Sequence, residues 1–263
     1  MSDQNTTKNS IINIELPESV DNAVKNLTDK PAATIGETIS DCMYLVFGGI
    51  SQMAALKRAK YAIELEQFKS DLEKKLNAVP EDKRIEPNTQ VICTALDNMR
   101  FCVEEEKLRD MFSSLIANSI NADKTNLVHP SYGEIIKQMT SLDASIFMWM
   151  SEQPLLPIMR IMSKSISENR QHDLSKSLIW NDWGNTDKVA ASLDNLQRLK
   201  LIDITFDSHY ADEKVYEYLK QRPHIVSLIK MNESRINECC KMDYSNGLIQ
   251  ITEFGKNFLS ACS

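Results

Sequence analysis

SLDNLQRLKLIDI (residues 192–204) and GLIQITEFGKNFL (residues 247–259) carry the clearest structural pattern in this 263-residue chain. The first begins within a helical pattern over residues 187–200, whose apolar residues share one face: Val189, Ala190, Leu193, Leu196 and Leu199. Alternating apolar residues over 201–206 then predict a strand. The second stretch predicts a strand over 247–251 and a final helix capped by Thr252. The order is therefore helix, strand, strand, helix.

Outward from these stretches, Ser141-Leu142-Asp143 opens an earlier helix that is rich in large apolar side chains and is interrupted by Pro154 and Pro157. With this helix added, residues 141–206 and 247–262 resemble a winged-helix fold. Residues 207–246 depart from a simple wing, because they predict a long and partly helical insertion. We therefore predict a winged-helix-like α+β unit over residues 141–263, with a small antiparallel sheet of two or three strands.

The first half of the chain shows helical periodicity throughout. No Gly or Pro occurs between Ala54 and Leu76, and apolar residues recur there every three or four positions: Tyr61, Leu65, Phe68, Leu72 and Leu76. Further helices are predicted over 89–103, 104–120 and 131–139. The sequence thus predicts a mainly α protein with a flexible or peripheral arm over residues 1–30 and a helical bundle over residues 31–140.

Charge and cysteine content narrow the class of protein. The formal net charge is −7, so neither half has the basic surplus of a typical nucleic-acid-binding protein. The six cysteines match no zinc or redox motif, and the polar start MSDQNTTKNS lacks the apolar core of an export signal. We therefore predict six free thiols and a cytoplasmic location.

The stretch LRDMFSSLIANSINADKTNLVHPSYGEIIKQMTSLDASIF (residues 108–147) and the ending ITEFGKNFLSAC (residues 251–262) indicate a family. From about Pro31 onward, the chain resembles the bacterial abortive-infection alpha family. The resemblance implies a link to defence against phage. It implies no catalytic residue and no cofactor.

The most recognisable part of that stretch is a short motif, and it has two interpretations. Its residues are His129, Pro130, Ser131, Tyr132 and Glu134. In the first, Pro130 forces an extended residue before a helix that Ser131 and Glu134 start as a capping box, so the motif is a structural junction. In the second, His129, Tyr132 and Glu134 form a ligand or partner site.

Signatures of catalysis are missing from the sequence. None of His129, His172, His209 and His224 follows an arginine at the spacing of a common ribonuclease motif. No P-loop, no H-E-x-x-H and no G-x-S-x-G motif occurs. We predict a protein that is not an enzyme and that holds no metal or cofactor. Its expected role is binding or regulation in phage defence, through a protein partner that the sequence does not identify.

Two alternative functions stay open. Gly48 and Gly49 lie in an apolar segment, residues 35–53, which is either a tightly packed helix or a helix that perturbs a membrane when it is released. The helix over 187–200 could instead bind nucleic acid, although its charged residues sum to only +1. The oligomeric state is not predicted.

Overall fold

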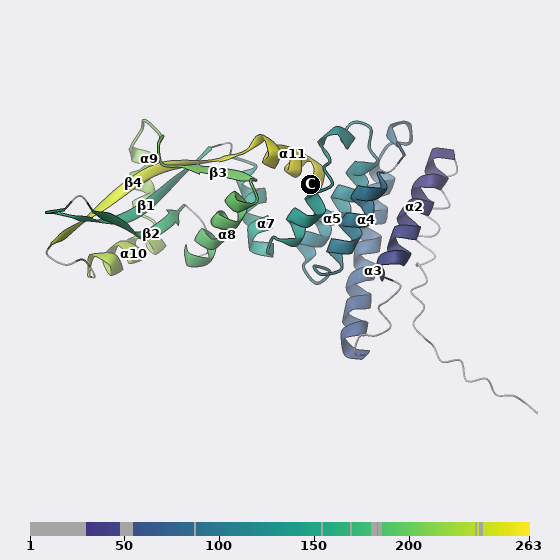
Figure 1. The fold of residues 1–263 in the computed structure, drawn as a ribbon, viewed down its shortest axis with the longest axis horizontal. Helices are drawn as coiled ribbons and strands as arrows, with labels where there is room; N and C mark the ends of the chain where they lie inside the picture. Colours follow the sequence, from purple (N-terminus) through teal and green to yellow (C-terminus); the bar gives the residue numbers. More distant parts are fainter. Residues whose placement is uncertain are drawn as a thin grey trace, which may run out of the picture. The chain divides into compact units, whose positions relative to one another are not determined.

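A computed structural model describes residues 30–47, 55–86, 88–153, 155–168, 170–179, 183, 186–234, 236 and 239–263 (Figure 1). Residues 1–29, which make up nearly all of the predicted arm, lie outside the described residues. So do residues 48–54, which include Gly48 and Gly49. The contacts divide the chain into unit 1, Met1–Gln138 with Ser260–Ser263, and unit 2, Met139–Leu259.

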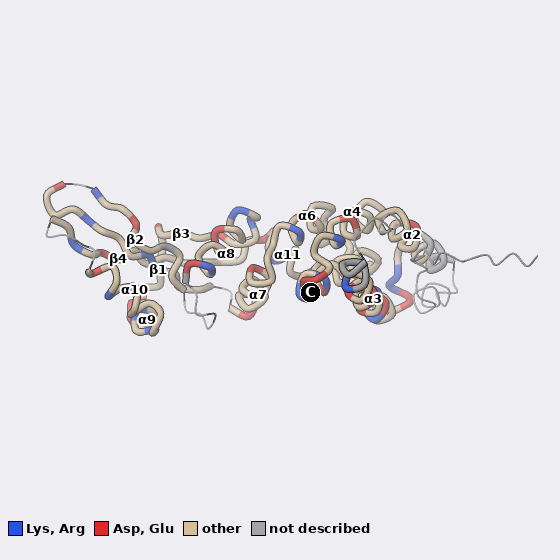
Figure 2. Tube along the Cα trace, turned by 90° about the horizontal axis from the view of Figure 1, so that it is seen from below, with Lys and Arg blue, Asp and Glu red and all other residues tan. Residues whose placement is uncertain are grey.

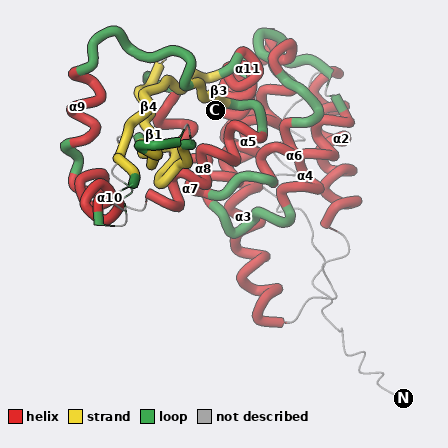
Figure 3. Tube along the Cα trace, turned by 60° about the vertical axis from the view of Figure 1, so that its left-hand side comes forward, coloured by secondary structure: helices red, strands yellow, loops and turns green. Residues whose placement is uncertain are grey.

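Unit 1 is helical in its described part (Figure 3). Its helices are α2 (Lys30–Phe47), α3 (Ala55–Ala78), α4 (Thr89–Met99), α5 (Glu106–Ser119) and α6 (Tyr132–Lys137). Two short 3-10 turns, Glu81–Lys83 and Thr125–Leu127, lie in the connections. The mainly helical character predicted for this part of the chain is confirmed.

The apolar face predicted for the long helix is the buried face of α3. Tyr61, Leu65, Phe68, Leu72 and Leu76 are each at most 8% exposed. The other faces carry basic and acidic residues side by side (Figure 2). Three of them form ion pairs with the segment that begins at Glu104, namely Lys60–Glu104, Glu64–Arg109 and Lys75–Asp110. The buried apolar residues and these ion pairs therefore both hold α3 against α5.

Unit 2 combines helices with an antiparallel sheet. In chain order it contains α7 (Ser141–Met150), β1 (Leu155–Ser165), β2 (Gln171–Leu178), α8 (Thr186–Arg198), β3 (Ile202–Thr205), α9 (Lys214–Lys220), α10 (Pro223–Glu233) and β4 (Cys240–Ile251). Helix α11 (Glu253–Cys262) follows and ends in unit 1. The strand order is β2-β1-β4-β3.

The prediction of two or three strands is wrong, since the described residues form a four-stranded sheet. Strands β3 and β4 contain the two predicted strands, whereas β1 and β2 were missed. Pro157 was expected to interrupt a helix but lies in β1, opposite Leu248 of β4. Strand β2 pairs with β1 only from Met159 onward, so the missing N–H of Pro157 breaks no recorded pairing on that side.

Helices α9 and α10 belong to the predicted insertion, which also contains the first half of β4. They pack against one face of the sheet, where Met159, Ile161, Leu178, Leu219 and Ile225 form a buried cluster. Tyr216 of α9 is fully buried and donates a hydrogen bond of 2.8 Å to the carbonyl of Gly247. The partly helical insertion thus supplies the core on that face of the sheet.

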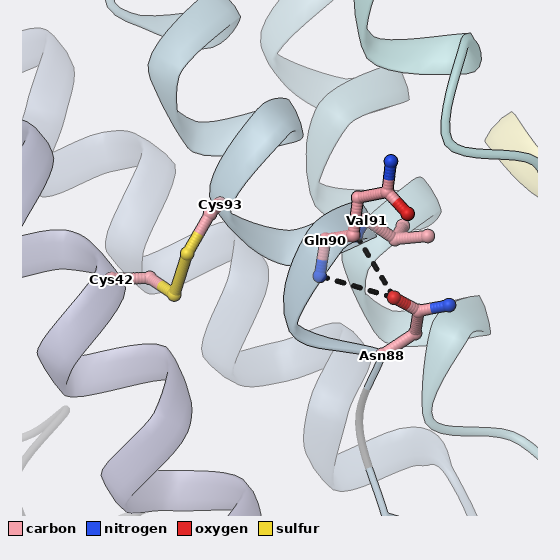
Figure 4. Close-up of a disulfide and its surroundings, with 5 residues drawn as sticks. All are labelled: Cys42, Asn88, Gln90, Val91 and Cys93. Carbon is pink, nitrogen blue, oxygen red and sulfur yellow. Dashed lines mark hydrogen bonds between the residues drawn. A yellow bond between two sulfur atoms is a disulfide. The ribbon is translucent and has the colours of Figure 1, made fainter.

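A disulfide joins Cys42 of α2 to Cys93 of α4, with 5.3 Å between the Cα atoms (Figure 4). The prediction of six free thiols is therefore wrong for this pair. The two cysteines are 51 positions apart, and only the packing of α2 on α4 brings them together. Cys102, Cys239, Cys240 and Cys262 are free.

Candidate functional site

Helix α6 carries Tyr132 and Glu134 of the predicted motif and packs closely on α4. A Cβ atom at Gly133 would lie 3.2 Å from the Cα of Ala95, so glycine permits this approach of the two backbones. Ile135 and Ile136 are buried on the same short helix. Glu134 and Lys137 stay exposed. The motif helix therefore presents one buried face and one charged face.

The turn before α6 is organised by His129 and Ser131. The backbone N–H of Ser131 donates to Nδ1 of His129 over 3.1 Å, and the Ser131 hydroxyl lies 2.7 Å from the same nitrogen. Pro130 is half-buried between them. Ser131 makes no side-chain cap bond to the helix, so the predicted capping box of Ser131 and Glu134 is wrong.

Glu134 instead accepts a hydrogen bond of 2.8 Å from Nδ2 of Asn98, near the end of α4. Asn98 is 1% exposed, and its Oδ1 has no hydrogen-bond partner among the described residues. The other carboxylate oxygen of Glu134 lies 3.8 Å from the Lys137 ammonium. Glu134 thus connects a buried amide on α4 to a surface cation on α6.

Tyr132 points into the core of unit 1. It is 2% exposed, and burial raises the pKa of its phenol to about 12. Its ring lies 5.8 Å from the imidazole of His129. Because the phenol keeps its proton at neutral pH, Tyr132 is suited to packing rather than to acid–base chemistry.

The exposed residue beside this motif is Phe101, which sequence reasoning missed. Its ring is 61% exposed and lies just after α4. The Arg100 guanidinium carbon is 4.7 Å from the ring centroid, and the Lys137 ammonium is 4.9 Å from it. We name Arg100, Phe101, Glu134 and Lys137 the Phe101 surface. Only the fold brings residues 100–101 and 134–137 together, so no local sequence signal could have found it.

A family model described as abortive infection alpha matches residues 60–262. The chain belongs to the abortive infection alpha family. No curated protein matches it. A solved structure of an uncharacterised protein from Alcanivorax borkumensis SK2 aligns with 53% of this chain and 94% of its own, at 12% identity and a TM-score of 0.33. A similarity that weak supports no conclusion about the fold.

The matched range includes the motif, which lies in unit 1, in the turn before α6 and on α6 itself. Tyr132 anchors this segment in the core, Glu134 ties it to α4, and His129 with Ser131 shapes the turn. Of the three residues of the predicted partner site, His129 and Tyr132 have ring centroids 5.8 Å apart, whereas Glu134 accepts a hydrogen bond from Asn98. Within the motif, His129 and Glu134 are exposed, and Lys137, which pairs with Glu134, adjoins Phe101.

The two alternative sites of this abortive infection alpha protein differ in how far they are described. Gly48 and Gly49 lie outside the described residues, and no described helix combines the length and the apolar character needed to cross a bilayer. In α8, Arg198 donates to Oδ1 of Asn195, which in turn donates to Asp143 of α7. That arginine is thus engaged in joining two helices.

Proposed function

We propose that this abortive infection alpha protein acts in phage defence without catalysis, by binding a protein partner through the Phe101 surface. One observation carries the proposal. An aromatic ring that is 61% exposed is held between an arginine and a lysine at the family's most recognisable motif. The family match supports the link to defence.

The chemistry of the Phe101 surface favours protein recognition. Aromatic residues and arginine are enriched in protein interfaces, where one ring often contributes much of the binding energy. The cations beside the ring of Phe101 limit its rotamers, so less conformational freedom is lost when a partner covers it. Such a ring suits a partner that presents an apolar or aromatic side chain.

Lys137 suggests a second feature of the partner. Its ammonium is 3.8 Å from Glu134, beyond hydrogen-bond distance, and its side chain is 37% exposed. A carboxylate from the partner could approach this ammonium more closely than Glu134 does. We therefore expect the partner to offer an apolar side chain for Phe101 with an acidic residue next to it.

We interpret α7, α8, β3, the end of β4 and α11 as a winged-helix-like core to which β1, β2, α9 and α10 are added. We infer that this core serves as a scaffold and not as a nucleic-acid reader. The inference is supported by the engagement of Arg198 and by the small net charge of its helix. Retention on immobilised DNA or RNA at low salt, lost as salt rises, would contradict it.

The test of the proposed function replaces Phe101 with Ala. Wild-type protein is expressed in a bacterial host, and a panel of phages is screened for those whose plating it reduces. Phe101→Ala should restore plating, because the ring that a partner would cover is gone. Its unfolding free energy should stay within about 0.5 kcal/mol of the wild-type value, since the side chain is exposed.

Ile63→Ala is the matched control, because Ile63 is 69% exposed on α3 of the same unit. This variant should protect as the wild type does. Affinity capture from infected cells should then yield a protein that binds wild type and Ile63→Ala but not Phe101→Ala. Full protection by Phe101→Ala would show that the surface has no part in defence.

A further inference from the structure

Two features distinguish α2 from the other helices of unit 1. Helix α2 packs on α4 at the edge of the helical unit (Figure 1). It lies before residue 60, where the family match begins, so Cys42 is outside the matched range and Cys93 is inside it. The disulfide therefore ties a segment outside the matched range to a helix of the family region.

Helix α2 contacts α4 through a narrow stripe of apolar residues. Ile35, Ile39, Met43 and Phe47 are at most 3% exposed, and Cys42 lies in the same stripe. Tyr44 and Leu45, on the outer side of the helix, are 76% and 77% exposed. The disulfide lies within this stripe, so it adds a covalent link to the apolar contact of α2 with α4.

The two sulfur atoms differ in access. Cys42 is 3% exposed, whereas Cys93 is half-buried. Four other cysteines, among them the exposed Cys239, are free thiols, so the chain is not an oxidised disulfide scaffold. Cys93 is thus the more accessible half of the disulfide, and access is one of the factors that set how readily an external thiolate attacks it.

We propose that Cys42 and Cys93 form a reversible disulfide clasp that controls whether α2 stays docked on α4. A dithiol reductant attacks the Sγ of Cys93 with one thiolate, and the S–S bond breaks with its electron pair moving to Cys42 Sγ, which takes a proton. The second thiol of the reductant then attacks the mixed disulfide and releases Cys93. Two electrons pass to the protein, and the reductant leaves as a disulfide.

Reduction uncovers two apolar surfaces at once. One is the apolar stripe of α2. The other is the part of α4 that this stripe covers while the disulfide is intact. With Tyr44 and Leu45 already exposed, the released helix would be apolar on most of its circumference at its C-terminal half. The clasp thereby converts a redox change into the release of a helix that can find another apolar partner.

The first experiment counts thiols in the full chain. Alkylation under native, non-reducing conditions followed by denaturation and further alkylation should label the four free cysteines, and prior reduction with a dithiol should raise the number to all six. Six labels without reduction would overturn the clasp.

The second experiment measures hydrogen exchange of residues 30–47. Reduction should speed exchange of these amides by at least about tenfold, because the tether no longer restricts their opening. The variant Cys42→Ser with Cys93→Ser should exchange at the reduced rate in either state. Unchanged exchange in α5 and β4 shows that the rest of the chain is folded.

Cys102→Ser together with Cys239→Ser provides the matched control, since it removes two thiols and keeps the clasp. Its α2 exchange should still respond to reduction as the wild type does. Equal exchange of residues 30–47 in oxidised and reduced wild-type protein would overturn the proposal. Neither experiment depends on Phe101, so its outcome is separate from that of the proposed partner surface.

Discussion

At the residue scale, Asn98 gives Glu134 a structural role in unit 1. The amide is almost fully buried, and its Nδ2 finds an acceptor only in the Glu134 carboxylate among the hydrogen bonds described for it. A buried donor without an acceptor costs more than the hydrogen bond itself contributes. Glu134 is therefore needed by α4 as much as by α6.

Replacing Glu134 with Ala should lower the free energy of unfolding by about 1–2 kcal/mol, because the Asn98 amide loses its acceptor. Glu134→Gln keeps an acceptor oxygen at the same place and should lose less. Urea melts of both variants provide the measurement. Equal stability of the Ala and Gln variants would mean that the hydrogen bond contributes nothing.

Tyr132 predicts a dependence of stability on alkaline pH. Its folded-state pKa of about 12 lies above the ordinary tyrosine value of about 10. The stabilisation from keeping the phenol protonated is present below about pH 10 and is lost as pH rises towards 12. Tyr61 is shifted in the same direction by burial and should add to the effect.

Tyr132→Phe should therefore flatten the fall in unfolding free energy between about pH 10 and pH 12. The measurement is a series of urea melts across that range. Tyr44→Phe removes a tyrosine that is 76% exposed and should leave the wild-type slope unchanged. A Tyr132→Phe slope as steep as that of the wild type would count against the buried phenol as its source.

The N-caps of the helices show where prediction from single residues succeeded and where it failed. Thr252 was predicted to cap the last helix, and its Oγ1 accepts the N–H of Gly255 at 2.9 Å. The same reasoning assigned a capping box to Ser131, but the box forms at Thr140 and Asp143. Both sites offer a hydroxyl three positions before an acid, but the Ser131 hydroxyl lies against Nδ1 of His129, a local contact that the spacing does not reveal.

At the element scale, the end of α8 is closed by a residue in the left-handed conformation. Lys200 has φ of 61°. The N–H of Leu201 donates to the carbonyl of Leu196, and that of Lys200 donates to Gln197, which together make a Schellman motif. The Lys200 carbonyl then accepts the hydroxyl of Thr252 at 2.6 Å. The turn thus fixes where β3 and α11 begin.

Lys200→Gly should make the protein about 1 kcal/mol more stable than Lys200→Ala, because glycine adopts positive φ without the strain that a Cβ causes there. Both variants remove the lysine charge, so the comparison isolates backbone conformation. Thermal melts of the pair give the difference. An Ala variant as stable as the Gly variant would show that the turn relaxes.

Strand β1 shows why part of the sheet escaped prediction. Buried residues lie on both of its faces, including Ile158, Met159 and Ile161, so the strand lacks the alternation that reveals a half-buried strand. Pro157 was also interpreted as the interruption of a helix, although it lies within the strand. Strand β2 carries the polar sequence QHDLSKSL, which resembles a loop. Strand β1 forms by pairing with β4, which starts 75 positions after β1 ends, and β2 forms by pairing with β1.

At the scale of the whole molecule, unit 1 is assembled from two separate pieces of chain. Asn118 of α5 is 7% exposed, and its Nδ2 donates to the carbonyl of Ala261 at 3.0 Å. Cys262 is buried in the same unit, and burial raises the pKa of its thiol well above the ordinary value. Ala261 and Cys262 therefore complete the core of the first unit.

Asn118→Ala should loosen this attachment. Hydrogen exchange of α5 and of residues 260–263 should become faster, because the hydrogen bonds between them are lost. Exchange in β1 and β4 should stay at the wild-type rate, since those strands belong to unit 2. A uniform acceleration across both units would indicate global destabilisation in place of the local opening expected here.

The nascent chain leaves the ribosome in an order that separates the two pieces of unit 1. Domains generally fold as they emerge, at about 5–20 residues per second. Unit 1 cannot finish in that way, because its closing residues are translated only after all of unit 2, a delay on the order of ten seconds. Until then Asn118 of α5 lacks the Ala261 carbonyl to which its Nδ2 donates. Burial of Ala261 and Cys262, rather than emergence of the first half of the chain, therefore completes the folding of unit 1.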